Sequence, residues 1–218
     1  MTSPDPSEPS PSWLAEHWWE FAAAVILSLA TVASAWSGYQ STRWSGENSR
    51  ASRAAADLRL DATQQLAVAN RQMSNDVGIF AMWFEAAVRG DERLSALIEE
   101  RFRPEFAAAF DSWRATGGSA ELPPGSPFDQ QAYQLAASVD GDRLNEQAVV
   151  EAAEADEFKQ RAENYVLTAV LYASVLFFAG IASKMRTPSA SHLAVGLSGL
   201  MFVLATLVML SLPASVSF

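Results

Sequence analysis

The chain has 218 residues, half of them hydrophobic, and its 25 acidic and 15 basic residues give a net charge of −10. This charge argues against a nucleic-acid partner, which needs a basic surface. The absence of cysteine excludes disulfides, thiolate metal sites and cysteine catalysis. The apolar residues are concentrated in three long blocks without a charged residue, and each block is long enough to cross a bilayer. The sequence therefore predicts an all-α membrane protein with three transmembrane helices.

The N-terminal residues 1–12 are rich in proline, serine and acidic residues, and we predict a disordered tail there. The first transmembrane helix is predicted over residues 13–39. The tail lacks the basic region of a signal peptide and no convincing cleavage site follows, so we interpret this helix as a retained anchor. Trp18 and Trp19 suit a membrane interface, where an indole ring is buried while its N–H stays hydrated.

Small residues recur on one face of the first predicted span. Ala30, Ser34 and Gly38 are four residues apart, a spacing that lets a second helix approach closely. We predict that this face packs against other helices. A stripe that lines a pore is the alternative, although conduction paths in membranes usually carry charged residues or filter motifs.

An unusual polar and aromatic cluster follows the first span, made of Trp36, Tyr39, Gln40, Arg43 and Trp44. An aromatic belt with a snorkelling arginine at the membrane interface accounts for it. Two alternatives stay open. Gln40 and Arg43 are candidates for binding a lipid headgroup, since a guanidinium group matches phosphate, or for ringing a pore mouth in a symmetric oligomer.

Residues 40–165 are predicted to form a long antiparallel helical hairpin that carries a small helical cap at about residues 90–140. On the outgoing arm the apolar residues follow an eleven-residue repeat, which favours nearly straight helix packing. A similar stripe on the returning arm runs into the second span. We expect Leu66 and Met73 to lie in the packed seam and the stalk to self-associate. The outgoing stripe comprises Ala55, Leu58, Ala62, Leu66, Ala69, Met73, Val77, Phe80, Phe84 and Val88, and the returning stripe comprises Leu144, Ala148, Ala152, Ala155, Phe158, Ala162, Val166, Ala169, Ala173, Phe177 and Gly180.

The cap is predicted from its aromatic residues and its helix signals. Asp91 is a predicted N-cap, and Pro104 should kink the next helix or start a new one. We expect a short helix from Pro127 to Ser138, with Gly141 preceding the return arm. An aromatic face at helical spacing predicts a core and not a ligand site. That face comprises Phe102, Phe106, Phe110 and Trp113.

The second and third transmembrane helices are predicted over residues 166–183 and 192–212. Arginines after the first span favour a cytoplasmic hairpin, whereas Lys184 and Arg186 in the short loop between the last two spans favour the opposite topology. We predict the cytoplasmic placement. The rule is weak for long domains, so the other topology stays open.

Several segments resemble a family of uncharacterised bacterial membrane proteins with three spans. The most specific is residues 35–46, AWSGYQSTRWSG, which includes a WSGYQxxRWSG motif after the first span. The resemblance implies a protein of the bacterial inner membrane and carries over no functional site. The other segments that carry it are residues 100–106 (ERFRPEF), Pro127-Phe128 with Tyr133, residues 164–167 (NYVL) and residues 176–180 (LFFAG).

Three classes of function follow from these patterns. We predict a non-enzymatic scaffold that lies in the lipid bilayer, self-associates as a homo-oligomer and presents its cap to a protein partner. The alternative is a homo-oligomeric channel or transport-associated subunit whose first span lines the pore. An enzyme is not expected, because no candidate nucleophile lies near a histidine or carboxylate array in the spans. We predict no cofactor and no metal ion.

Overall fold

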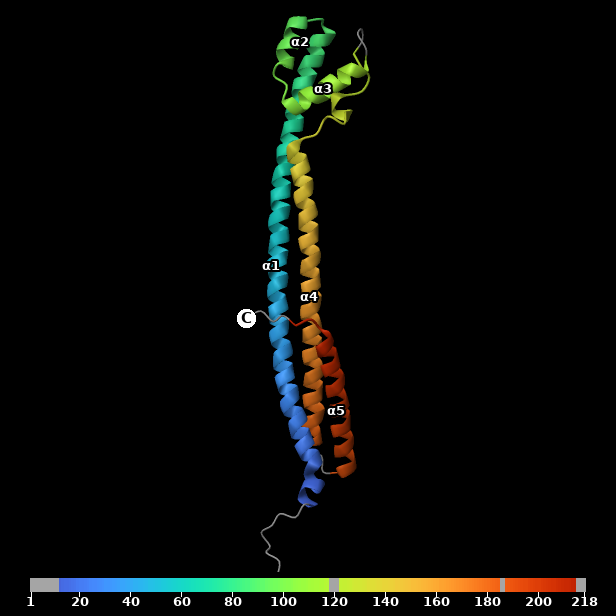
Figure 1. The fold of residues 1–218 in the computed structure, drawn as a ribbon. Helices are drawn as coiled ribbons and strands as arrows, with labels where there is room; N and C mark the ends of the chain where they lie inside the picture. Colours follow the sequence, from blue (N-terminus) through green and yellow to red (C-terminus); the bar gives the residue numbers. More distant parts are fainter. Residues whose placement is uncertain (1–11, 118–121, 185–186, 215–218) are drawn as a thin grey trace, which may run out of the picture. The chain divides into compact units, whose positions relative to one another are not determined.

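The structure is a computed structural model that describes residues 12–117, 122–184 and 187–214. The predicted tail at residues 1–12 falls outside these ranges except for Ser12. Every regular element in the described ranges is helical, as predicted (Figure 1). The elements are α1 (Ser12–Val88), α2 (Glu92–Glu99), α3 (Pro104–Thr116), the 3₁₀ helix η1 (Pro127–Asp129), α4 (Ala136–Ala182) and α5 (Pro188–Ser211).

Three of these helices, α1, α4 and α5, are each long and apolar enough to cross a membrane. No proline occurs in α1, and the predicted first span and the outgoing arm form one uninterrupted helix. The chain divides into two compact units. Unit 1 comprises Met1–Ala51 and Ala153–Phe218, and unit 2 comprises Ser52–Ala152. Both units therefore contain a segment of α1 and a segment of α4.

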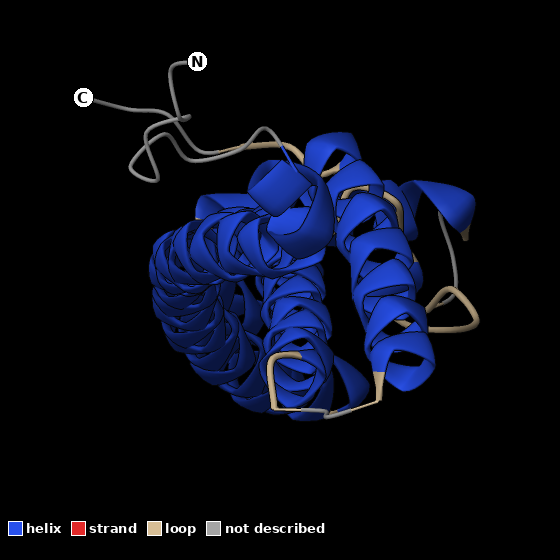
Figure 2. Ribbon diagram, turned by 90° about the horizontal axis from the view of Figure 1, so that it is seen from below, coloured by secondary structure: helices blue, strands red, loops and turns tan. Residues whose placement is uncertain are grey.

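In unit 1, α1, α4 and α5 pack alongside one another (Figure 2). Ala23 of α1 packs with Ala182 of α4, and Ala30 packs with Tyr172 and Val175. These pairs run in opposite directions along the two helices, so α1 and α4 are antiparallel here. The alanines at these contacts are small, which lets the helix backbones lie close together there.

In unit 2, the same two helices also meet through small residues. A methyl group added at Gly141 of α4 would lie 2.8 Å from Leu66 Cγ of α1 and 3.3 Å from the carbonyl oxygen of Ala62. Gly141 was expected to precede the return arm. Instead, α4 begins at Ala136 and places this glycine inside the helix, where only a hydrogen fits against Leu66. The expected helix from Pro127 to Ser138 is wrong, because η1 ends at Asp129 and turns follow it.

The cap of unit 2 has an aromatic core, as predicted. Trp83 of α1 lies edge-on to Phe110 of α3 with ring centroids 4.6 Å apart, and Trp113 is almost fully buried beside them. Asp91 caps α2 by accepting a hydrogen bond from the backbone N–H of Leu94, and Pro104 is the first residue of α3. Both local predictions are confirmed.

The predicted apolar stripes are wrong over part of each long helix. On α1, Met73, Val77, Phe84 and Val88 are exposed. From Ala55 to Trp83 the buried residues recur every seven positions instead of following an eleven-residue repeat. A seven-residue repeat keeps nearly the same face of a helix toward its neighbour. On α4, Val166 and Phe177 are exposed too. The buried residues of α1 include Ala55, Ala62, Ala69, Asp76 and Trp83, and those of α4 include Tyr165, Thr168, Tyr172, Val175, Ala179 and Ala182.

Candidate functional site

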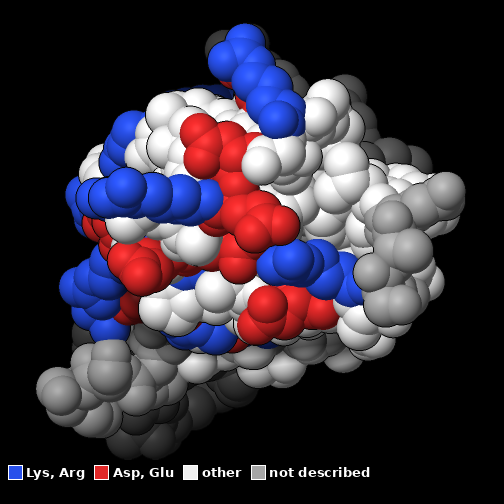
Figure 3. Space-filling model, turned by 90° about the horizontal axis from the view of Figure 1, so that it is seen from above, with Lys and Arg blue, Asp and Glu red and all other residues white. Residues whose placement is uncertain are grey.

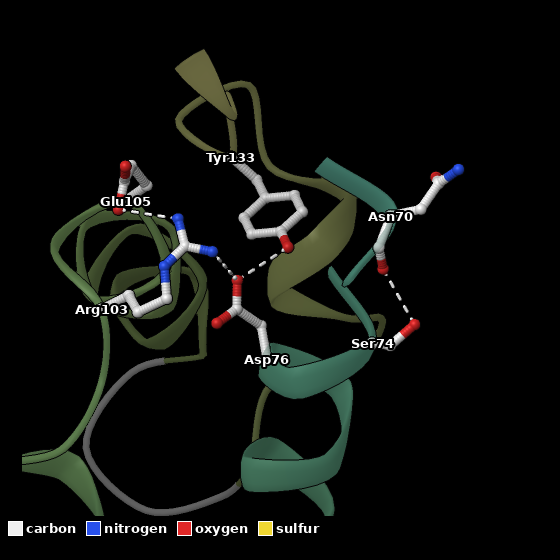
Figure 4. Close-up of polar contacts among 6 residues, drawn as sticks. All are labelled: Asn70, Ser74, Asp76, Arg103, Glu105 and Tyr133. Atoms are coloured by element: carbon white, nitrogen blue, oxygen red, sulfur yellow. Dashed lines mark hydrogen bonds and ion pairs between the residues drawn. The ribbon is translucent and has the colours of Figure 1, made fainter. Parts of the chain in front are cut away.

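A buried carboxylate lies where the cap meets α1 in unit 2. Asp76 is 2% exposed and is one of the buried residues that recur every seven positions on α1. Its Oδ2 accepts a hydrogen bond from the Tyr133 hydroxyl at 3.0 Å and one from Arg103 Nη1 at 3.3 Å (Figure 4). Arg103 also forms an ion pair with Glu105 at 3.0 Å. Neighbouring polar groups of α1 are satisfied within the helix, as where the Ser74 hydroxyl donates to the Asn70 carbonyl at 2.9 Å.

Burial raises the pKa of Asp76 above its ordinary value of 3.8, and the hydrogen bond from Tyr133 and the charge of Arg103 offset only part of this shift. Burial, together with the hydrogen bond to Asp76, raises the pKa of Tyr133 well above 10.0. The pKa of Glu105 is lowered, mainly because its carboxylate accepts a hydrogen bond from its own backbone N–H. The hydrogen bond from Arg103 lowers the pKa further. The tyrosine hydroxyl therefore acts as a fixed hydrogen-bond donor.

This arrangement ties two separate chain segments to α1. Arg103 precedes α3, and Tyr133 lies between η1 and α4. The carboxylate of Asp76 therefore holds both the segment before α3 and the segment before α4. The cluster contains two carboxylates and no histidine, and the two acids pair with different nitrogens of Arg103, Asp76 with Nη1 and Glu105 with Nη2. Within the described ranges, no group of three or more histidine, cysteine, aspartate or glutamate side chains could hold a metal ion. Its geometry is that of a structural anchor.

A second anchor holds the outer part of the cap. Glu99 Oε1 accepts hydrogen bonds from Trp83 Nε1 at 2.7 Å and from Arg114 Nη1 at 2.9 Å. The Arg114 guanidinium also lies 5.4 Å from the Phe110 ring centroid. Seen from above in Figure 3, acidic side chains gather near the middle of the surface and basic side chains lie around them.

The predicted cluster after the first span is divided between the inside and the outside of unit 1. Gln40 is fully buried and Trp44 is nearly so, whereas Trp36 and Tyr39 are exposed. Arg43 is partly exposed. Trp44 stacks on Phe158 of α4 with ring centroids 5.7 Å apart. The burial of Gln40 within its own chain disfavours it as a pore-mouth residue.

The candidate packing residues are also divided. Ala30 is fully buried among α1, α4 and α5, while Ser34 is half-buried and Gly38 is exposed with no neighbouring atom within 4 Å of an added methyl group. In unit 2, Leu66 is half-buried against Gly141, and Met73 is exposed beside a hollow lined by Tyr133 and the start of α4.

Most of the polar interior of unit 1 was not found by sequence reasoning. Ser37, Thr168 and Ser191 are almost fully buried, and each hydroxyl donates to a backbone carbonyl at 2.8–3.1 Å. The Tyr172 hydroxyl lies 3.1 Å from Thr206 Oγ1 of α5. Four of these residues, Ser37, Thr168, Tyr172 and Ser191, fall on buried faces that a search for apolar stripes passes over. The available signal was the seven-residue recurrence of tyrosine at positions 165 and 172.

Comparison with known protein families, curated proteins and solved structures finds no match to this chain.

Proposed function

We propose that the protein is a multi-pass membrane protein whose unit 1 lies in the bilayer. The outward side chains of α1, α4 and α5 are large and apolar, including Val32, Phe177 and Leu207, while buried positions hold serine, threonine, glutamine and tyrosine. Exposing so much apolar surface to water is costly, at about 25 cal/mol per Å². In lipid the same surface has no such cost. The family resemblance adds the expectation of a bacterial inner membrane.

Within that membrane setting, we infer that the protein is a scaffold that self-associates through one face of α1 in unit 2. The observation that carries this proposal is an uncharged exposed face between Arg71 and Glu85. The only charged residue in that interval is Asp76, which is buried. Met73, Val77 and Phe84 are exposed there. Contiguous exposed apolar surface on a polar unit is typical of a protein interface.

A second copy of the chain fits this face. Gly78 and Ala81 lie on it between the larger side chains, and no neighbouring atom lies within 4 Å of a methyl group added at Gly78. Small residues at the centre let two helices approach closely, and an uncharged face meets an identical face without repulsion. A two-fold contact between copies requires this kind of self-complementary surface.

The test replaces Val77 or Phe84 with glutamate and measures the mass of the purified particle in detergent by light scattering. We expect the wild-type chain to be an oligomer and both variants to be monomers, because each would bury an unpaired charge at the interface. Leu60→Glu is the matched control, since Leu60 is exposed on α1 among the charged residues Asp57, Arg59 and Asp61.

A monomeric wild-type chain, or variants that keep the wild-type mass, would overturn self-association through this face. Leu66→Glu is unsuitable as a probe, because Leu66 packs against Gly141 of the same chain and the substitution would disrupt unit 2 itself. The channel alternative is not advanced, since Gln40 is buried within its own chain.

A further inference from the structure

An apolar groove runs along the outside of unit 1 between α1 and α5, with α4 forming its floor. The α1 wall includes exposed Leu29 and Val32, and the α5 wall includes Phe202. All three helices therefore contribute to one continuous depression. Its lining residues are Leu29, Val32, Ala33, Trp36, Tyr172, Phe202, Thr206 and Met209.

The groove presents only apolar atoms to an occupant. Its two hydroxyl groups are already used, because Thr206 Oγ1 donates to the Phe202 carbonyl at 2.8 Å and lies 3.1 Å from the Tyr172 hydroxyl. A ligand with polar groups along its length would leave them unpaired here, which costs about 1–3 kcal/mol for each group. The chemistry of the lining therefore selects an alkyl chain.

Cationic groups lie beyond one end of the groove. Leu29, Trp36 and Arg43 are seven residues apart on α1, so the arginine continues the face that forms the groove wall. On the α5 side, Met209 lines the groove and also packs against the cluster that contains Trp44. The Arg161 guanidinium lies 4.9 Å from the centroid of the Trp44 ring, and its Nη2 is already paired with Glu157 Oε2 at 3.1 Å.

We propose that this groove binds one acyl chain of an anionic phospholipid, whose phosphate lies at the end marked by Arg43. A guanidinium group matches a phosphate diester in both charge and planar hydrogen-bond geometry. The aromatic side chains of Trp36 and Tyr39 on the same part of α1 are of the kind found at the boundary between hydrocarbon and headgroups. The inference rests on the proposed insertion of unit 1 in the bilayer.

A lipid is a better occupant than a helix of a second copy. An α-helix with its side chains is about 10–12 Å wide and presents separate knobs, whereas an alkyl chain can follow an irregular apolar wall. The charge at one end of the site also matches a lipid with a charged head and an uncharged tail.

The experiment measures lipid retained by the purified full-length chain, using native mass spectrometry from detergent with added phosphatidylglycerol or phosphatidylcholine of the same acyl length. We expect the wild-type chain to retain phosphatidylglycerol about fivefold more than phosphatidylcholine, the size of effect that one basic residue near an anionic surface supplies. Arg43→Gln should abolish this preference. Ala33→Phe should fill the groove and abolish retention of both lipids.

Ala35→Phe is the matched control, because Ala35 is exposed on α1 and does not line the groove. Equal retention by Ala33→Phe and Ala35→Phe would overturn the site, and equal retention of the two lipids by the wild-type chain would overturn the headgroup assignment. A fall in particle mass for Ala33→Phe with unchanged lipid retention would assign the groove to a second copy instead. If alkaline carbonate releases the wild-type chain from vesicles, membrane insertion itself is refuted. If the chain resists extraction but retains no lipid, only the lipid site in the groove is refuted.

Discussion

Unit 1 and unit 2 use segments of the same two helices, α1 and α4, and both bury small residues between them, but the cap of unit 2 adds a core of aromatic rings. Unit 2 buries large aromatic rings such as Trp83 and Phe110 and exposes charged side chains. Unit 1 buries small and hydroxyl-bearing side chains such as Ser37 and Thr168 and exposes large apolar ones. The proposed insertion of unit 1 in the bilayer accounts for this difference. Water drives apolar groups inward, whereas lipid gives apolar groups no such preference.

Removal of a large ring gives the largest expected difference between the units. Phe110 is 2% exposed in unit 2, and Phe177 is 62% exposed in unit 1. We expect Phe110→Ala to reduce the free energy of unfolding of unit 2 by about 3–5 kcal/mol, because it leaves a cavity in a packed core. Phe177→Ala removes the same ring from an exposed position, which faces lipid in the proposed membrane setting, and should have little effect on unit 1.

Hydrogen exchange of backbone amides in α3 and in the part of α4 around Phe177, measured on the detergent-solubilised chain, reports the two local stabilities separately. Comparable loss of protection in both variants would contradict the contrast between the two interiors. It would mean that Phe177 packs against protein and not against lipid.

Tyr133 in unit 2 and Tyr172 in unit 1 each have a hydrogen-bonded hydroxyl, and they provide a smaller comparison. Tyr133 of unit 2 donates to the carboxylate of Asp76. We expect Tyr133→Phe to destabilise the attachment of the cap by about 1.5–3 kcal/mol, the range for a hydrogen bond to a charged group. Tyr39→Phe is the control, because Tyr39 is exposed. Faster proteolysis of the cap in the first variant alone is the expected result.

The same site predicts a pH dependence. Burial raises the pKa of Asp76 in the folded chain above 3.8, so folded unit 2 binds this proton more tightly than the unfolded chain does. Asp76 should therefore make unit 2 more stable as the pH falls from the folded pKa toward 3.8, and less stable as the pH rises through that interval. Asp76→Asn should remove this slope. A variant with the wild-type pH profile of cap proteolysis would show that Asp76 does not titrate there.

The smallest expected effect belongs to Tyr172 in unit 1, whose hydroxyl pairs with that of Thr206. Hydrogen bonds between membrane helices contribute only about 0.6 kcal/mol on average, since either partner finds other partners when the helices separate. Tyr172→Phe should therefore change the thermal stability of unit 1 only slightly. A loss as large as that expected for Tyr133→Phe would indicate that unit 1 depends on this polar contact as strongly as unit 2 depends on Asp76.

The sequence by itself determined the helical class, the three long apolar helices, the start of α3 at Pro104, the Asp91 cap and the aromatic core. These features depend on local chemistry: the length of uncharged apolar runs, the fixed backbone of proline, the side-chain acceptor of aspartate and the helical spacing of rings.

Only the tertiary structure decided which face of each long helix is buried. On α4 the apolar pattern indicated Val166 and Phe177, but the buried face carries Tyr165, Thr168 and Tyr172. In a segment that is apolar on every side, hydrophobicity does not distinguish the face that meets protein from the face that meets lipid. Asp76 escaped prediction for a related reason, because a carboxylate is buried only when distant residues supply its partners, and Arg103 and Tyr133 lie 27 and 57 positions further along the chain.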